Sequence, residues 1–197
     1  MPKIVDKEVM RERILEAAMQ TFRAQGFQAA KMADIAKAAG LAKGTVYLYF
    51  ESKEALTTAL VKWLFQDIER QIMPTDMAQT LDDYMAQIRW ALDAPEESGI
   101  DTRMFFEVLG PSFGSAEVVG EIAAFFDRIG AINARQLKHL IKVGEVRQDV
   151  DADAMGRSMA SLVDGMVMHR TLFGLADTQF RAMTNETLEL IRRGLQP

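Results

Sequence analysis

The sequence contains no cysteine and only two histidines among its 197 residues. Without cysteine the chain can form neither a disulfide nor a thiolate metal site, which is typical of a protein of the reducing cytoplasm. The two histidines, His139 and His169, are far apart in the sequence, and neither belongs to an HExxH-like pairing with a carboxylate. A glycine-rich phosphate-binding loop is also missing. We therefore expect no enzyme activity, no catalytic residue, no metal site and no cofactor.

Long hydrophobic runs are missing as well. No segment is apolar over the roughly eighteen residues that a membrane-spanning helix needs. The opening MPKIVDKEVMRERI is charged and lacks the apolar core of a signal peptide. The sequence therefore predicts a cytoplasmic protein that has no membrane partner.

Proline is scarce, with five residues in the chain, whereas segments with helical periodicity are long. Hydrophobic residues make up 49% of the sequence, so the chain can bury a sizeable core. Its length suits one large or two small domains. Together these features predict an all-α protein.

Charge is unevenly distributed along the chain. Residues 1–55 hold nine Lys and Arg against seven Asp and Glu, a net charge of +2. Residues 56–197 hold fourteen against twenty-one, a net charge of −7. Phosphates would attract the first segment and repel the second. A surplus of +2 is small, so any DNA affinity must come from placed contacts and from dimerisation.

Residues 31–53, KMADIAKAAGLAKGTVYLYFESK, have the pattern of two short helices separated by a tight turn. Apolar residues recur along one helix face before Gly40, a residue suited to ending a helix. In the second helix, residues 43–50, Val46 and Phe50 are spaced to face inward. The DNA major groove admits one helix and offers hydrogen-bonding base edges. The residues left to face such a groove are Lys43, Thr45, Tyr47 and Tyr49.

A longer helix is expected on each side of this pair. The first covers residues 7–24 and stops at Gly26. The last begins after Ser52, a good N-cap, and runs to residue 73, where a proline ends it. Its N-terminus and Lys53 together could hold a DNA phosphate. The first helix is expected to bury Ile14, Leu15, Ala18, Met19 and Phe22.

Residues 13–56 resemble the DNA-binding domain of TetR/AcrR-type transcriptional repressors. The matching motifs are Ile-Leu-x-Ala-Ala, Phe-x-x-x-Gly-Phe, Asp-Ile-Ala, Ala-Gly-Leu and Gly-Thr-Val-Tyr-x-Tyr-Phe-x-x-Lys. A lone helix-turn-helix pattern is a weak signal, but here a dozen positions match in register. The rest of the chain matches only in length and helical character.

The resemblance implies a three-helix helix-turn-helix DNA-binding domain, residues 1–55, followed by a larger helical domain, residues 56–197, that binds a ligand and dimerises. It also implies that Tyr47 and Lys53 contact the DNA backbone, while Lys43, Thr45 and Tyr49 are the candidates for base contacts.

The sequence departs from the family at two helix N-caps. Members often carry Ser or Thr where this chain has Lys31 and Ala42. Neither residue can cap a helix with a hydroxyl. Lys31 could contact a phosphate through its charge instead, whereas Ala42 cannot.

The C-terminal part is predicted to form five helices, over residues 76–94, 101–109, 115–143, 152–173 and 178–195. By the resemblance, the last two pack against their copies in a homodimer. Residues that could form this surface, or else an intramolecular core, are Met155, Met159, Leu162, Met166, Val167, Leu188, Ile191 and Leu195.

A ligand cavity inside the second domain is also implied by the resemblance. Nine of the thirteen methionines follow residue 72, and methionine suits pockets for varied apolar shapes as well as ordinary cores. An apolar cavity favours a lipophilic small-molecule effector, whereas the acidic surplus of residues 56–197 favours a cationic one. The candidates for lining the cavity, each of which could instead be a surface residue or part of an Arg–carboxylate pair, are Trp90, Arg103, Phe106, Glu107, Asn133 and Asp164.

Two other classes of function compete with this interpretation. An all-helical protein–protein interaction module would need no cluster of outward-facing cations and phenols, and an enzyme in the C-terminal domain would need catalytic groups that the sequence lacks. The resemblance therefore predicts a dimeric repressor that binds a palindromic operator in double-stranded DNA. A small ligand would release it by shifting the population of domain arrangements.

Overall fold

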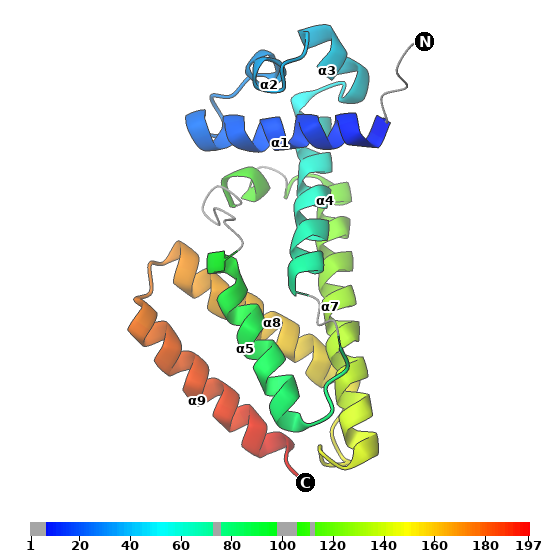
Figure 1. The fold of residues 1–197 in the computed structure, drawn as a ribbon, viewed down its shortest axis with the longest axis vertical. Helices are drawn as coiled ribbons and strands as arrows, with labels where there is room; N and C mark the ends of the chain where they lie inside the picture. Colours follow the sequence, from blue (N-terminus) through cyan, green and yellow to red (C-terminus); the bar gives the residue numbers. More distant parts are fainter. Residues whose placement is uncertain (1–6, 73–75, 98–105, 111–112) are drawn as a thin grey trace. The chain divides into compact units, whose positions relative to one another are not determined.

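A computed structural model describes residues 7–72, 76–97, 106–110 and 113–197 (Figure 1). These residues form helices joined by turns, with no strand among them, so the all-α prediction is confirmed. Residues 106–110 form a further helical turn. The long and short helices are α1 (Lys7–Gln25), α2 (Met32–Ala38), α3 (Lys43–Tyr49), α4 (Lys53–Ile72), α5 (Leu81–Glu97), α7 (Ala116–Val143), α8 (Ala152–Leu172) and α9 (Asp177–Leu195).

The chain divides into two compact units. The first comprises Met1–Gln66 and Arg103–Glu121, and the second comprises Asp67–Thr102 and Ile122–Pro197. The division between the units therefore falls inside α4 and again inside α7. The functional boundary predicted at residue 55 lies within the first unit.

The first unit is built around α1, with α2 and α3 together on one side of it (Figure 1). The whole predicted stripe of α1 is buried, and the three following helices also contribute buried residues to the first unit. Gly26 ends α1 with a φ of +80°, and Gly40 ends α2 with a φ of +64°, both in the left-handed region that favours glycine. The residues from α2, α3 and α4 that complete this core include Met32, Ile35, Ala36, Val46, Leu56, Leu60 and Leu64.

The second unit packs α5, α8 and α9 together with the C-terminal part of α7 (Figure 1). Several polar groups inside it are paired, although the buried Thr184 hydroxyl has no hydrogen-bond partner among the described residues. Tyr84 is buried and donates a 2.9 Å hydrogen bond to Oδ1 of Asn133, whose amide nitrogen donates to the Ile129 carbonyl. Burial raises the pKa of the Tyr84 hydroxyl. Buried Gln136 accepts a hydrogen bond from the backbone N–H of Ala78.

Helix α5 begins five residues later than predicted. The backbone N–H of Thr80 donates to the Asp83 carboxylate, and the N–H of Asp83 donates to the Thr80 hydroxyl. This reciprocal capping box sets the start at Leu81. Met77, which falls within the helix predicted over residues 76–94, lies before α5 and is 46% exposed. The other long helices begin and end within one or two residues of their predicted limits, and residues 101–105 lie outside the described part of the chain.

The eight apolar residues expected at a dimer surface fall into two groups. Met159, Met166, Leu188 and Leu195 are buried in the core of the second unit itself. The other four are partly buried against the same core. For the buried four, the intramolecular alternative is correct. Among the described helices, none is long and apolar enough to cross a membrane.

Candidate nucleic-acid interface

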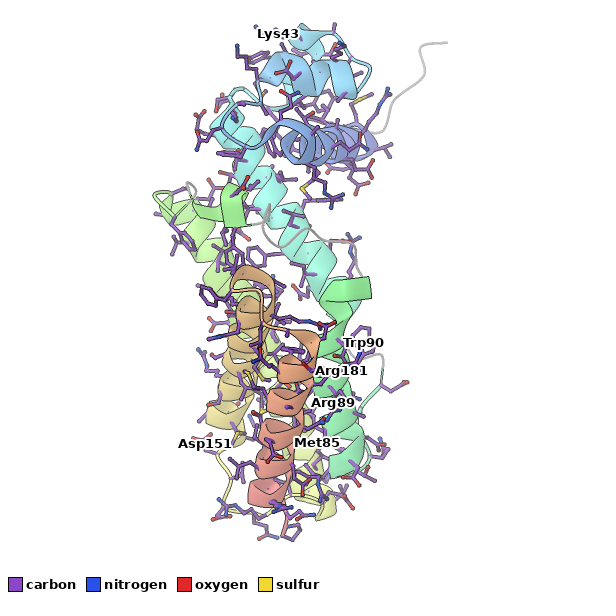
Figure 2. The ribbon with its side chains drawn as sticks, turned by 90° about the vertical axis from the view of Figure 1, so that its left-hand side faces the viewer. Lys43, Met85, Arg89, Trp90, Asp151 and Arg181 are labelled. Carbon is purple, nitrogen blue, oxygen red and sulfur yellow. The ribbon has the colours of Figure 1, made fainter. Side chains whose placement is uncertain are left out.

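Helix α3 has one buried and one open face. Val46 and Phe50 are buried at i and i+4, and they anchor the helix to the core of the first unit. Elsewhere on the helix, Lys43, Tyr47 and Leu48 are exposed, Tyr47 to 41% and Leu48 to 82%. The Lys43 ammonium lies 5.6 Å from the centre of the Tyr47 ring. Figure 2 shows Lys43 at the outer edge of this unit. The helix therefore presents a cation, a phenol and an apolar side chain to solvent.

Thr45 and Tyr49 are both partly buried, and a residue of α1 supports the C-terminal end of α3. Thr45 lies at the N-terminal half of the helix, while Tyr49 is its last residue. The Arg11 guanidinium donates a hydrogen bond of 3.3 Å to the Tyr49 carbonyl and lies 4.6 Å from the centre of the Phe50 ring. A cation at a helix C-terminus is favoured by the helix dipole and satisfies an orphan carbonyl. Sequence reasoning missed Arg11 because no local pattern pairs it with a residue thirty-eight positions away.

The N-termini of α2 and α3 have no hydroxyl cap, as the sequence predicted. Lys31 and Ala42 occupy these positions in extended conformations. The Asp34 carboxylate accepts a 3.0 Å hydrogen bond from the backbone N–H of Lys31, which fixes the start of α2. The Lys31 residue is exposed and so is accessible to a phosphate.

Lys53 faces the interior of the first unit. Its ammonium donates hydrogen bonds to the carbonyls of Phe27 and, at 2.8 Å, Ala30, and it lies 4.4 Å from the centre of the Phe27 ring. Desolvation lowers the pKa of Lys53, and the nearby Glu54 charge opposes this shift. Two of its three ammonium hydrogens are therefore engaged, so the predicted phosphate contact has one left. The Ser52 hydroxyl accepts from the N–H of Ala55, which confirms Ser52 as the N-cap of α4.

Leu48 was not among the predicted site residues, although the sequence contained a signal for it. Two residues along a helix rotate the side chain by about 200°. Leu48 therefore lies nearly opposite the buried Val46, on the solvent-exposed side of α3. An apolar residue in that position is unusual enough to single out.

The predicted ligand residues are divided between the two units. Trp90, on α5, is 46% exposed (Figure 2). Asp164, on α8, is exposed as a residue, but partial desolvation of its carboxyl raises the pKa of that group. Asn133 is buried in the same unit and is bonded to Tyr84. In the first unit, Phe106 and Glu107 lie on the helical turn 106–110. Arg103 lies outside the described residues. The described residues contain no group of three His, Asp or Glu that could hold a metal ion.

Two family models match the sequence, and together they cover most of it. Residues 14–60 match the model for bacterial regulatory proteins of the tetR family. Residues 81–193, more than half of the chain, match the model for the C-terminal part of BetI-type transcriptional repressors. The two matches fall on the helix-turn-helix segment and on the helices from α5 to α9.

Similar sequences include characterised and uncharacterised regulators. The HTH-type transcriptional regulator BetI of Stenotrophomonas maltophilia is 26% identical over 178 residues, which cover 88% of this chain and 87% of that protein. An uncharacterized HTH-type transcriptional regulator of Mycobacterium tuberculosis is 33% identical over 125 residues. That alignment covers 60% of this chain and 62% of the mycobacterial protein, so the match spans less than two thirds of it.

Solved structures share the fold at low sequence identity. A TetR transcription regulator from Haloarcula marismortui superposes with a TM-score of 0.78 at 18% identity, covering 96% of this chain and all of that one. The transcriptional regulator FadR of Bacillus subtilis, solved in complex with stearoyl-CoA, superposes with a TM-score of 0.65 at 22% identity. The superposition covers 94% of this chain and 99% of the FadR chain. These likenesses establish the fold alone. With the two family matches, the helix-turn-helix and the all-helical architecture, this chain belongs to the TetR family of transcriptional regulators.

Proposed function

We propose that the protein is a repressor that binds a palindromic operator as a homodimer and is released by a small apolar ligand. The observation that supports it best is the open face of α3. That face presents Lys43, Tyr47 and Leu48 to solvent while Val46 and Phe50 anchor the helix. A rigid, exposed short helix with donors on its outer side suits the DNA major groove.

The proposed contacts fall into two classes. Base edges are read by Lys43, Thr45 and Tyr49. Phosphates are held by Tyr47 and Lys31, with Lys53 able to offer its third ammonium hydrogen. Phosphate contacts set the affinity and its salt dependence, whereas base contacts set the sequence preference.

Dimerisation is proposed through the outer face of α9. Its inner face buries Phe180, Thr184 and Leu188, whereas Met183 and Leu190 are exposed seven residues apart, Leu190 to 73%. A second copy covering this face would remove both apolar side chains from water. It would also supply a second recognition helix, which must sit about 34–36 Å from the first to enter the next major groove.

The proposed ligand is lipophilic, and the FadR complex with stearoyl-CoA supports this class because that ligand carries a long acyl chain. We propose that Trp90 and Asp164, two predicted ligand residues that lie in the second unit, contribute to binding. A ligand that prefers one domain arrangement weakens DNA binding by its differential affinity for the two states. Helix α4 belongs to both units and is the proposed connection between them.

The test is fluorescence anisotropy with DNA fragments flanking the protein's own gene, in a series of salt concentrations, for the wild type and Tyr47→Ala. We expect tight, salt-sensitive binding to one palindromic fragment, weakened in the variant. Tyr47 is exposed, so the variant should melt at the wild-type temperature. Weak binding to every fragment, indifferent to Tyr47, would show that the helix-turn-helix is structural here.

A further inference from the structure

Leu48 is the most exposed of the large apolar side chains in the described part of the chain, at 82%. It sits in the middle of α3, between Tyr47 and Tyr49, in a helix whose other aliphatic residue, Val46, is fully buried. The fold does not use Leu48 for packing. An exposed leucine in a helix that presents a binding face is available to a partner.

The surroundings of Leu48 are open and polar. Gly44 precedes it by one helical turn on the same side, and a Cβ placed there would meet no atom within 4 Å. An incoming surface can therefore approach the backbone of α3 closely at this point. Lys43 is exposed beside Gly44, with its ammonium near the Tyr47 ring. A partner on this face must accept a cation and phenol donors around a single apolar contact.

We propose that Leu48 contacts the C5 methyl group of a thymine in each operator half-site, and so determines part of the sequence preference. The methyl group of thymine is the apolar feature that base edges present in the major groove, and the other groups there are hydrogen-bond donors and acceptors. A protein partner would need a negative, mostly polar surface with one apolar site for Leu48. The DNA major groove has these features, because its phosphates are negative and the thymine methyl group is apolar. This inference rests on the proposed DNA-binding function.

The test replaces thymine by deoxyuridine, which lacks only the methyl group. The probe is a palindromic duplex selected by the wild-type protein from a randomised library. Each symmetry-related pair of thymines is replaced in turn. We expect one pair whose replacement weakens wild-type binding by about fourfold per half-site, the value of one buried methyl group. Leu48→Ala should bind the thymine duplex more weakly and should be insensitive to deoxyuridine at that pair.

Val9→Ala is the matched control, because Val9 is another exposed aliphatic residue of the first unit, on α1. It should keep the wild-type response to deoxyuridine. Both variants should melt like the wild type. Equal binding of thymine and deoxyuridine duplexes by the wild type would overturn the Leu48 contact while leaving DNA binding intact. A response that persists in Leu48→Ala would assign the methyl contact to another side chain, and failure of the wild type to select any duplex would overturn the proposed function itself.

Discussion

Two cations of the first unit are used to hold it together. Arg11 donates a hydrogen bond to the carbonyl of Tyr49, the last residue of α3, and Lys53 donates to two carbonyls of the connection between α1 and α2. Both links join residues more than twenty positions apart, across elements that carry the proposed DNA contacts. Of the nine Lys and Arg in residues 1–55, two therefore stabilise the fold. The number of cations available to contact DNA is smaller than the count suggests.

Lys53→Met should destabilise the protein by about 1.5–3 kcal/mol, the range for a hydrogen bond to a charged group. Methionine keeps much of the length of the aliphatic stem, but it leaves the Phe27 and Ala30 carbonyls without this donor and the Phe27 ring without its ammonium contact. Urea denaturation monitored by circular dichroism measures the change. Lys37→Met, on the exposed face of α2, is the control and should change stability little.

The same variant distinguishes the structural role of Lys53 from its proposed contact with a DNA phosphate. If its remaining hydrogen also reaches a phosphate, the slope of log K against log salt should become shallower by about 0.9 for each phosphate that Lys53 neutralises. A structural role alone weakens binding without changing that slope. Unchanged stability together with a shallower slope would show that the intramolecular bonds contribute nothing.

Among the secondary-structure elements, α7 and α8 approach each other most closely at a glycine, Gly156 of α8, within the described part of the chain. A Cβ at Gly156 of α8 would lie 2.5 Å from the Gly130 carbonyl oxygen and 2.6 Å from the Ala134 nitrogen, both backbone atoms of α7. Two helices can meet this closely only where one lacks a side chain. The glycine therefore sets the distance between these helices in the second unit.

Gly156→Ala should lower the free energy of unfolding by about 1–3 kcal/mol, because the helices must separate to admit a methyl group. Gly120→Ala is the matched control. It is an exposed glycine inside α7 whose Cβ would meet nothing within 4 Å, so it should raise stability by about 0.5–1 kcal/mol through helix propensity. Differential scanning calorimetry of both variants gives the comparison. A Gly156→Ala protein as stable as Gly120→Ala would contradict the close-packing argument.

The last turns of α9 contain a charge cluster that should appear in the pH dependence of stability. Glu189 accepts hydrogen bonds from Arg192 and Arg193, which lower its pKa from 4.5 to about 2. A carboxylate whose pKa is lower in the folded state stabilises the fold above its unfolded pKa, and this contribution is lost as the pH falls from about 4.5 towards 2. The cluster is exposed to solvent, so the effect should be small and should weaken with added salt.

Glu189→Gln should therefore lower the melting temperature slightly at pH 7, and the difference should vanish as the pH falls to about 2. Melting curves at low salt, taken at regular steps between neutral pH and that limit, measure the difference between variant and wild type. A difference that stays constant over this range would mean that the carboxylate charge has no part in stabilising α9.

At the scale of the whole molecule, features with a local pattern were predictable. The helices, the buried stripe of α1 and the glycine stops follow from periodicity and backbone preference. The Thr80–Asp83 capping box is also legible in the sequence as Thr-x-x-Asp, and it would have corrected the predicted start of α5. The bonds from Arg11 to Tyr49 and from Lys53 to Phe27 depend on tertiary packing, and no spacing in the sequence indicates them.

The second unit was less predictable for the same reason. Asn133, chosen as a ligand residue because it is polar in an apolar helix, has its amide bonded to Tyr84 and to a backbone carbonyl. Periodicity also cannot distinguish an apolar stripe that packs inside the unit from one that meets a second copy. The exposed fractions make that distinction. On α9, Leu188 is buried inside the unit, whereas Leu190 is exposed and available to a second copy.

Leu190→Glu should convert the proposed dimer into a monomer without harming the fold. Leu190 is 73% exposed, so the substitution disturbs no core packing, but a second copy would have to bury the new carboxylate. Sedimentation velocity should show the wild type as a dimer and the variant as a monomer. Asn185→Glu, which adds the same charge at another exposed position of α9, should stay dimeric.

The same substitution should change how the protein binds its operator. Two linked recognition helices bind paired half-sites with an avidity about 10²–10⁴-fold above that of one helix. Leu190→Glu should therefore bind the full operator only as tightly as it binds a single half-site, and the half-site affinity itself should match that of the wild type. A monomeric variant that kept full operator affinity would mean that α9 holds two copies together without bringing their recognition helices to the DNA as a pair. A dimeric variant would place the interface on another face of the second unit.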